Sequence, residues 1–241
     1  MATHSVTWQL LKPVDEVVNT QVKGYDKKGT TFFKFTTPLT EDIQSLAVAG
    51  LNLFTFCEYS LTHFHETTES SFYLAPERIN CSCILPLSSP TEYNAVLGCA
   101  DRVIRVMEGK KVIQEIQVEH SATAIAHFPL AHDVLNQHTA RKEIFYGTSC
   151  GDVAQMFLDA GTAKQGAMLR NTRNRGSVTQ VFSGFDVTKD GVDDIVVGRD
   201  DGSVEIYDIN DQGHLKQVCP LIQSIISSAD NLQSFAPQLS H

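Results

Sequence analysis

The sequence repeats a strand–turn–strand unit with a glycine just before each turn, and this repeat constrains the fold more than any other feature. The three glycines are Gly98, Gly147 and Gly198, spaced by 49 and 51 residues. In the last copy, two β-rich runs flank the turn at 200–202. An Asp-Gly pair in such a turn is typical of a hairpin, because glycine accepts a positive φ. We therefore expect a hairpin at each position.

The strand after each turn recurs at a similar spacing. Its first apolar residue is Val103, Val153 or Val204 in the three copies, spaced by 50 and 51 residues. A period of about 50 residues with several short strands in each repeat is typical of propeller blades. The pattern predicts an all-β chain: a partial, incomplete β-propeller of WD40-like four-stranded blades, with about four to five blade units.

Two full periods contain enough strand-forming residues for one blade each. The strands expected in the first are 112–118, 122–128, 143–148 and 152–158. The strands expected in the second are a run near Met168, then 178–185, 193–198 and 203–209.

The register is less regular upstream. Residues 21–25 resemble an earlier outer strand followed by a turn at 27–29, and 72–74 resemble the next outer strand. The distance from Phe72 to Val103 is only 31 residues, which predicts a short blade. The predicted organisation is an atypical segment with a possible strand at 1–22, blades over 23–209, and the start of a further blade or a frayed tail at 210–241.

Charge and hydropathy exclude several classes. Nineteen basic and 28 acidic residues give a net charge of −9 and a pI near 5.4, which disfavours a broad electrostatic grip on nucleic acid or an anionic membrane. The longest uncharged run, 43–57, is shorter than the ~20 residues that a membrane helix needs, so we expect no membrane insertion. The N-terminus shows no secretory signal, and we expect the six cysteines to be reduced.

Several motifs carry a family resemblance. They are 184–187 with Gly191, then 194–202, 97–106, 146–149 and 72–74. Their order and spacing resemble the N-terminal β-propeller of the seventh Bardet–Biedl syndrome protein family, whose members are subunits of the ciliary BBSome. The resemblance covers roughly 23–208. Family members are several times longer, with further blades, a coiled coil and C-terminal domains, so the chain is expected to be a partial product.

The resemblance implies a non-enzymatic scaffold that supports a coat-like complex for trafficking of ciliary membrane proteins. It implies other BBSome subunits as partners, the second and ninth Bardet–Biedl proteins closest, with no nucleic acid. It also implies a location in the cytoplasm and cilium, including the periphery of the ciliary membrane and the basal body or centrosome. A partial blade array leaves apolar end faces uncovered, so we also expect self-association and binding by chaperones.

An acidic loop at 186–194 raises the alternative of a calcium-binding propeller module. Asp186, Thr188, Asp190 and Asp194 offer oxygen ligands, with a backbone carbonyl from Val192. The competing interpretation is a turn between strands in which the same side chains satisfy local backbone groups. We expect no metal and no cofactor, and keep calcium as the alternative.

A second metal alternative is zinc. His63 and His65, and likewise Cys81 and Cys83, are two residues apart, so each pair shares one face of a strand and is able to converge on an ion. The spacing matches no standard zinc module, and the competing interpretation is a polar segment followed by a buried strand with small apolar thiols.

Two further motifs have local explanations. Residues 147–151 fit the G-x-S-x-G pattern, so Ser149 is a candidate hydrolase nucleophile, but the hydrolase elbow needs a helix after the turn and the sequence continues as a strand. Arg170, Arg173 and Arg175 form a candidate anion or partner contact, for which a solvated loop between strands is the competing interpretation.

Overall fold

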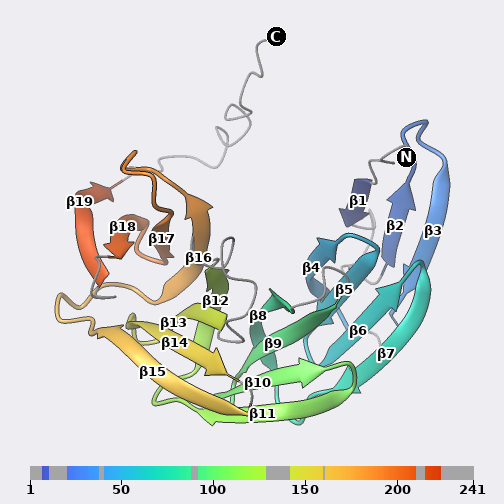
Figure 1. Cartoon of the computed structure of the whole chain (residues 1–241), viewed down its shortest axis with the longest axis horizontal. Coiled ribbons are helices and arrows are strands. Elements are labelled where there is room, and N and C mark those ends of the chain that lie inside the picture. The colour runs from blue at the N-terminus through green and yellow to red at the C-terminus, as the bar shows by residue number, and fades with distance from the viewer. Residues whose placement is uncertain are drawn as a thin grey trace.

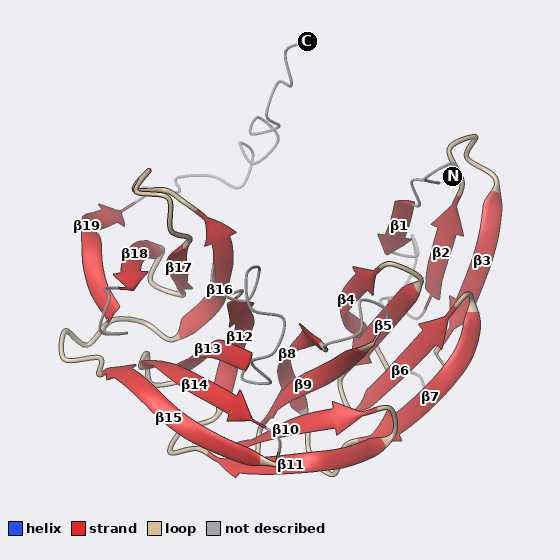
Figure 2. Cartoon of the chain, in the orientation of Figure 1, coloured by secondary structure: helices blue, strands red, loops and turns tan. Residues whose placement is uncertain are grey.

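The computed structural model describes residues 7–10, 21–37, 41–87, 92–128, 142–159, 161–209 and 215–223. Within these ranges every regular element is a β-strand, and the strands form five antiparallel sheets arranged one after another along an open arc (Figures 1 and 2). None of the described residues belongs to a helix long and apolar enough to cross a membrane.

The first sheet has three strands, β1 (Thr7–Leu10), β2 (Gln21–Tyr25) and β3 (Thr31–Thr36). The second has β4 (Ile43–Ala49), β5 (Asn52–Cys57), β6 (Ser60–His65) and β7 (Thr68–Leu74). The third has β8 (Ile79–Pro86), β9 (Tyr93–Cys99), β10 (Val103–Glu108) and β11 (Lys111–Gln117).

The fourth sheet has β12 (Ala122–Phe128), β13 (Lys142–Thr148), β14 (Val153–Asp159) and β15 (Thr162–Leu169). The fifth has β16 (Val178–Phe185), β17 (Asp194–Arg199), β18 (Ser203–Ile209) and β19 (Leu215–Gln223). Strand order within each sheet follows chain order, with β8, β12 and β16 side by side on the inner side of the arc and β7, β11 and β15 on its outer side (Figure 1). This arrangement confirms the partial propeller.

The predicted division into blades is wrong by one strand. The predicted strand 112–118 falls on β11, which pairs with β10 and closes the third sheet. The strand near Met168 is β15, which pairs with β14 and closes the fourth sheet. A repeat can be cut at any of its strands, and hydropathy does not reveal which neighbours are hydrogen-bonded. The true boundary is the crossing from an outer strand to the next inner strand.

The upstream strands exist, and 72–74 lie on an outer strand as predicted, whereas 21–25 do not. Residues 21–25 form β2, which lies between β1 and β3 and is therefore not an outer strand. Phe72 lies on β7, the outer strand of the second sheet, whereas Val103 begins the third strand of the next one. The 31-residue spacing compared non-equivalent strands, and the third sheet has all four. Residues 1–6, 11–20, 210–214 and 224–241 of the predicted terminal segments lie outside the described residues.

Pairing also corrects the alignment of the three hairpins. Gly98 lies opposite Ile104, Gly147 opposite Val153, and Gly198 opposite Val204. Ile104, not the first apolar residue Val103, is thus the counterpart of the two valines. The strand positions then repeat at 49 and 51 residues, the spacing of the glycines.

The core consists of four apolar clusters, each between two successive sheets. Side chains alternate between the two faces of a strand, so a strand with neighbours on both faces is apolar at consecutive positions. In β13, Ile144 and Tyr146 face the third sheet, whereas Phe145 faces the fifth. All three are buried. This explains the runs of consecutive apolar residues in the middle strands.

Candidate functional site

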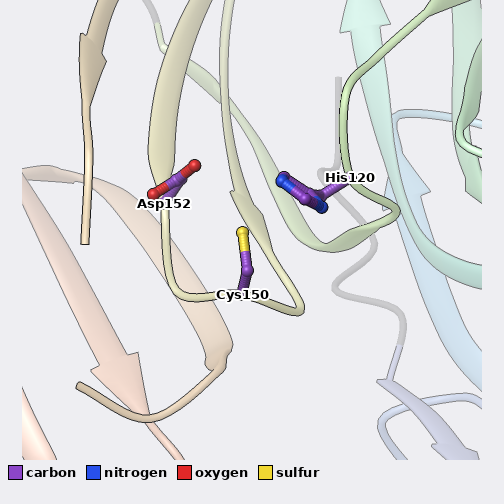
Figure 3. Close-up of side chains that lie close together, drawn as sticks. All are labelled: His120, Cys150 and Asp152. Atoms are coloured by element: carbon purple, nitrogen blue, oxygen red, sulfur yellow. The ribbon is translucent and has the colours of Figure 1, made fainter. Parts of the chain in front are cut away.

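The β13–β14 turn and the connection from β11 to β12 bring together His120, Cys150 and Asp152 (Figure 3). Each offers one ligand atom, and the three atoms lie within 4.8 Å of one another. Figure 3 shows the Cys150 sulfur pointing toward the gap between the Asp152 carboxylate and the His120 ring. Among the described residues, this is the group of three or more His, Cys, Asp or Glu side chains placed closely enough to share an ion.

Local backbone geometry positions the turn. Gly151 adopts a φ of 88°, in the left-handed region that favours glycine, and its N–H donates to the carbonyl of Thr148 at 3.0 Å. The Ser149 N–H donates to the carbonyl of Ser121 at 3.2 Å. The turn of the fourth sheet is therefore held against the connection that leaves the third sheet, and this contact places His120 beside Cys150.

The Asp152 carboxylate is buried and fixed on both oxygens. Oδ1 accepts the Asn171 N–H at 2.7 Å, and Oδ2 accepts Arg170 Nη1 at 3.0 Å. Arg170 also donates through Nη2 to Glu119 Oε2 at 2.7 Å. Hydrogen bonding to Arg170 lowers the pKa of Glu119, and the same bond together with that to Asp152 raises the pKa of Arg170. Glu119 and Arg170 therefore carry their full charges at neutral pH.

A cysteine, a histidine and an aspartate also make up a nucleophilic triad, but the geometry here does not suit that chemistry. A triad requires a hydrogen bond from nucleophile to base and another from base to its orienting group. Within the described residues, no hydrogen bond joins the His120 ring to Cys150 or Asp152. The Cys150 sulfur instead lies 3.2 Å from Thr148 Oγ1. The arrangement suits ligation of a metal better than nucleophilic attack.

The hydrolase candidate Ser149 lies in the same turn. The chain passes from β13 through the turn into β14, so the helix that a nucleophile elbow requires does not follow. The Ser149 hydroxyl is 3.4 Å from that of Ser121. Its surroundings are those of a contact between two successive sheets.

In the acidic loop at 186–194, aspartate side chains accept hydrogen bonds from backbone N–H groups of the same loop. The N–H groups of Val187 and Thr188 donate to Asp194 Oδ2 at 2.7 and 2.9 Å. Asp186 accepts the N–H groups of Asp190 and Gly191 at 3.2 and 2.9 Å. The three aspartates are not among the groups whose ligand atoms converge within 4.8 Å in the described residues. Calcium binding there stays the alternative to the expected absence of a metal.

The four zinc candidates lie in two separate places. His63 and His65 lie on β6, and one ring nitrogen of each donates to Asn52 Oδ1, at 2.9 and 3.0 Å. His63 also stacks on Phe54 with ring centroids 4.2 Å apart, and burial lowers its pKa.

Cys81 and Cys83 lie on β8 and pack against the cluster between the third and fourth sheets. Burial raises the pKa of both thiols, that of Cys83 to about 12. Each pair shares a face as expected, but the structure does not bring the two pairs together as one ligand set.

The arginine loop lies at the junction of the fourth and fifth sheets. Arg170, Arg173 and Arg175 line a pocket of about 190 Å³ together with the buried Arg199. Arg199 donates to Glu205 at 2.7 Å and to the carbonyls of Gly151 and Gly176 at 2.7 and 3.1 Å. This arginine therefore connects the hairpin of the fifth sheet to that of the fourth.

Sequence reasoning missed the group of His120, Cys150 and Asp152, because the three residues do not form a motif together. His120 precedes an inner strand, whereas Cys150 and Asp152 flank Gly151 in a hairpin turn. The expected propeller fold is the signal that could have found them. The connection that enters the inner strand of a sheet, here β12, must pass the turn between the second and third strands of that sheet, here β13 and β14.

Comparison with known proteins places these sheets in a family. A family model described as the BBS7 beta-propeller matches residues 17–232. The chain belongs to the BBS7 β-propeller family. It is 33% identical over 187 residues to the mouse (Mus musculus) "BBSome complex member BBS7" and 26% identical over 196 residues to "BBSome complex member bbs-7" of Caenorhabditis elegans. These matches cover 78% and 80% of this chain and confirm the family resemblance.

The chain spans only about a quarter of those relatives, 25% and 26% of their lengths. Among solved structures, it resembles the BBS1 N-terminal domain in a complex with ARL6, with a TM-score of 0.59, 13% identity, and coverage of 82% of this chain and 57% of that one. It also resembles the WD40 repeats of RRP9, with a TM-score of 0.60, 13% identity, and coverage of 83% and 59%. At such identities these structures establish the propeller fold alone.

Proposed function

We infer that the chain is a non-enzymatic scaffold of the BBSome, which supports assembly of a coat-like complex for trafficking of ciliary membrane proteins. The observation that carries this proposal is its membership of the BBS7 β-propeller family. The relatives that it matches are named as members of the BBSome complex. The chain acts in the cytoplasm and at the cilium, where such a complex would work.

The side chains support a binding role over a catalytic one. Ser149 lacks the elbow that a hydrolase needs, and neither Cys150 nor Asp152 is hydrogen-bonded to a base in the described residues. Buried polar groups such as Arg199 instead tie neighbouring sheets together. The interior of the molecule therefore serves the framework, which leaves turns and outer strands to make contacts with partners.

We expect the second and ninth Bardet–Biedl proteins to be the direct partners. The outer strand β11 suits such a contact, because its residues alternate between exposed and half-buried and Ile113 is an apolar side chain 40% exposed there. Outer strands also present unpaired backbone groups at the edge of each sheet.

Pairwise co-purification tests this proposal. The 241-residue chain is co-expressed with each of the two proteins in turn, and complexes are resolved by size-exclusion chromatography. The RRP9 WD40 domain serves as the matched control, since it shares the fold but not the family. We expect a stoichiometric complex with at least one of the two proteins and none with the control. Equal recovery with chain and control, or none with either, contradicts the proposed partners.

A further inference from the structure

We propose that His120, Cys150 and Asp152 bind one zinc ion, which joins the connection between β11 and β12 to the β13–β14 turn. The three ligand atoms already lie within 4.8 Å of one another, and they come from two segments 30 residues apart in sequence. The site is independent of the proposed scaffold role, and no residue of the calcium or zinc alternatives drawn from sequence belongs to it.

The donor set selects the metal. Nitrogen from imidazole, sulfur from a thiolate and oxygen from a carboxylate together suit Zn²⁺, which accepts all three in tetrahedral geometry. Calcium and magnesium prefer oxygen ligands throughout, so neither matches a site in which two of three donors are nitrogen and sulfur. A water molecule would complete four ligands in the isolated chain, as in zinc sites with three protein ligands.

The surrounding charges also suit a divalent cation. Arg170 forms an ion pair with Asp152, with Nη1 3.0 Å from Oδ2, and its charge would by itself repel a metal. Arg170 is also paired with Glu119, with Nη2 2.7 Å from Oε2. Two carboxylates and one guanidinium leave one net negative charge. Ionisation of Cys150 adds a second, so Zn²⁺ brings the cluster to neutrality. Binding would release the thiol proton to solvent.

The carboxylate is held ready before any metal binds. Asp152 is 5% exposed, and the Asn171 N–H and Arg170 fix its two oxygens, so little side-chain entropy is lost when it becomes a ligand. Groups that hydrogen-bond to a ligand orient it in established metal sites in the same way. The Ser149–Ser121 backbone hydrogen bond keeps the two segments adjacent.

Zinc titration of the purified 241-residue chain under reducing conditions tests the site, with calorimetry as the readout. We expect one zinc per chain. Losing a group that only orients a ligand typically lowers metal affinity 10–100-fold, so Cys150→Ser and His120→Ala should each lower it by more than about 100-fold. The matched control is His65→Ala, which removes a histidine from the other candidate pair and should leave the affinity unchanged. Retained affinity in Cys150→Ser, or its loss in His65→Ala, overturns the proposal.

Cobalt provides a second readout that does not depend on how the variants fold. Cobalt(II) in place of zinc should give the wild-type chain a thiolate-to-metal charge-transfer band in the near ultraviolet, together with the visible bands of a tetrahedral site. Binding without the thiolate band, or no binding of either metal to the wild-type chain, overturns the assignment.

Discussion

The same glycine position has different surroundings in the third, fourth and fifth sheets. A Cβ atom on Gly98 would lie 2.5 Å from the sulfur of Cys81 on its own sheet and 3.0 Å from the Cβ of Ala122, where the next sheet begins. A Cβ atom on Gly147 would overlap the side chain of Val178, again on the next sheet. At Gly198, the nearest atom would be Thr179 Oγ1 of its own sheet, at 3.7 Å. A side chain at this position would therefore meet the following sheet in the third and fourth sheets, whereas in the fifth it would make only ordinary contacts within its own sheet.

The fifth sheet also shows this difference, because some of its side chains are buried against another sheet and others are exposed. Val178 and Ile195 are fully buried against the fourth sheet. By contrast, Phe182 is 50% exposed and Phe185 61% exposed. One face of the sheet is thus a finished core interface, while large apolar side chains elsewhere on β16 remain in solvent. Exposed aromatic side chains of this size are suited to contact with another protein.

The largest difference in stability is expected between alanine variants of two phenylalanines. Phe145 is fully buried between the fourth and fifth sheets, with its ring centroid 5.6 Å from that of Phe128. Phe145→Ala should lower the free energy of unfolding by about 4 kcal/mol through lost burial and the cavity left behind. Phe185→Ala should change it by less than about 0.5 kcal/mol. Urea denaturation measures both, and equal losses would contradict the distinction between the two environments.

Two arginines sharpen the comparison. Arg199→Met leaves Glu205 buried and without its main partner, which should cost about 3 kcal/mol. Arg105 pairs with Asp101 and with Glu115, whose side chains are 25% and 60% exposed, so in Arg105→Met both carboxylates regain water. That variant should lose only about 1 kcal/mol. A larger loss for Arg105→Met in thermal unfolding would contradict the stronger contribution of the buried Arg199–Glu205 pair.

The glycines themselves come next. Gly147→Ala should cost about 2 kcal/mol, because the new methyl group forces Val178 away in a close-packed interface. Gly198→Ala meets ordinary van der Waals distances and should be within about 0.5 kcal/mol of the parent chain. Chemical denaturation of the pair side by side provides the measurement. A costly Gly198→Ala would mean that something packs on the last sheet after all.

A hairpin position shared by the three sheets gives a smaller effect with the opposite sign. Arg102, Gly151 and Gly202 all adopt positive φ, at 63°, 88° and 79°. Only the arginine carries a Cβ that disfavours this conformation, so Arg102→Gly should stabilise the chain by about 1 kcal/mol. The melting temperature should rise, and a fall would show that the Arg102 side chain contributes a contact that outweighs the backbone cost.

The smallest predicted effect concerns the dependence of stability on pH. Asp201 accepts the N–H groups of Ser203 and Gly176 at 2.9 and 3.1 Å, and hydrogen bonding to Ser203 lowers its pKa to about 2. A depressed folded-state pKa gives stability that is present above the unfolded value near 3.9 and is lost as pH falls toward 2. Asp201→Asn should therefore flatten the stability profile between about pH 4 and pH 2. Identical profiles for the parent chain and Asp201→Asn in acid titration would show that Asp201 makes no such contribution.

The hairpins and the fold class were predictable because their signals are local. Asp200 to Gly202 mark a turn, and the apolar residues that follow, Val204 and Ile206, lie on one strand. The division into sheets was not, because the hydropathy of β11 does not reveal whether it pairs with β10 or begins the next sheet. The proposed metal site was hidden for the same reason, since His120 meets Cys150 only after two successive sheets are packed.

Affinity purification of the tagged chain from ciliated cells, read by mass spectrometry, tests the scaffold role most directly. A buried apolar cluster lies between each two successive sheets, so we expect the chain to fold. We also expect it to recover other BBSome subunits well above a tagged control propeller. Recovery of chaperones alone would contradict the account, because it would mean that these sheets do not by themselves form the binding surface.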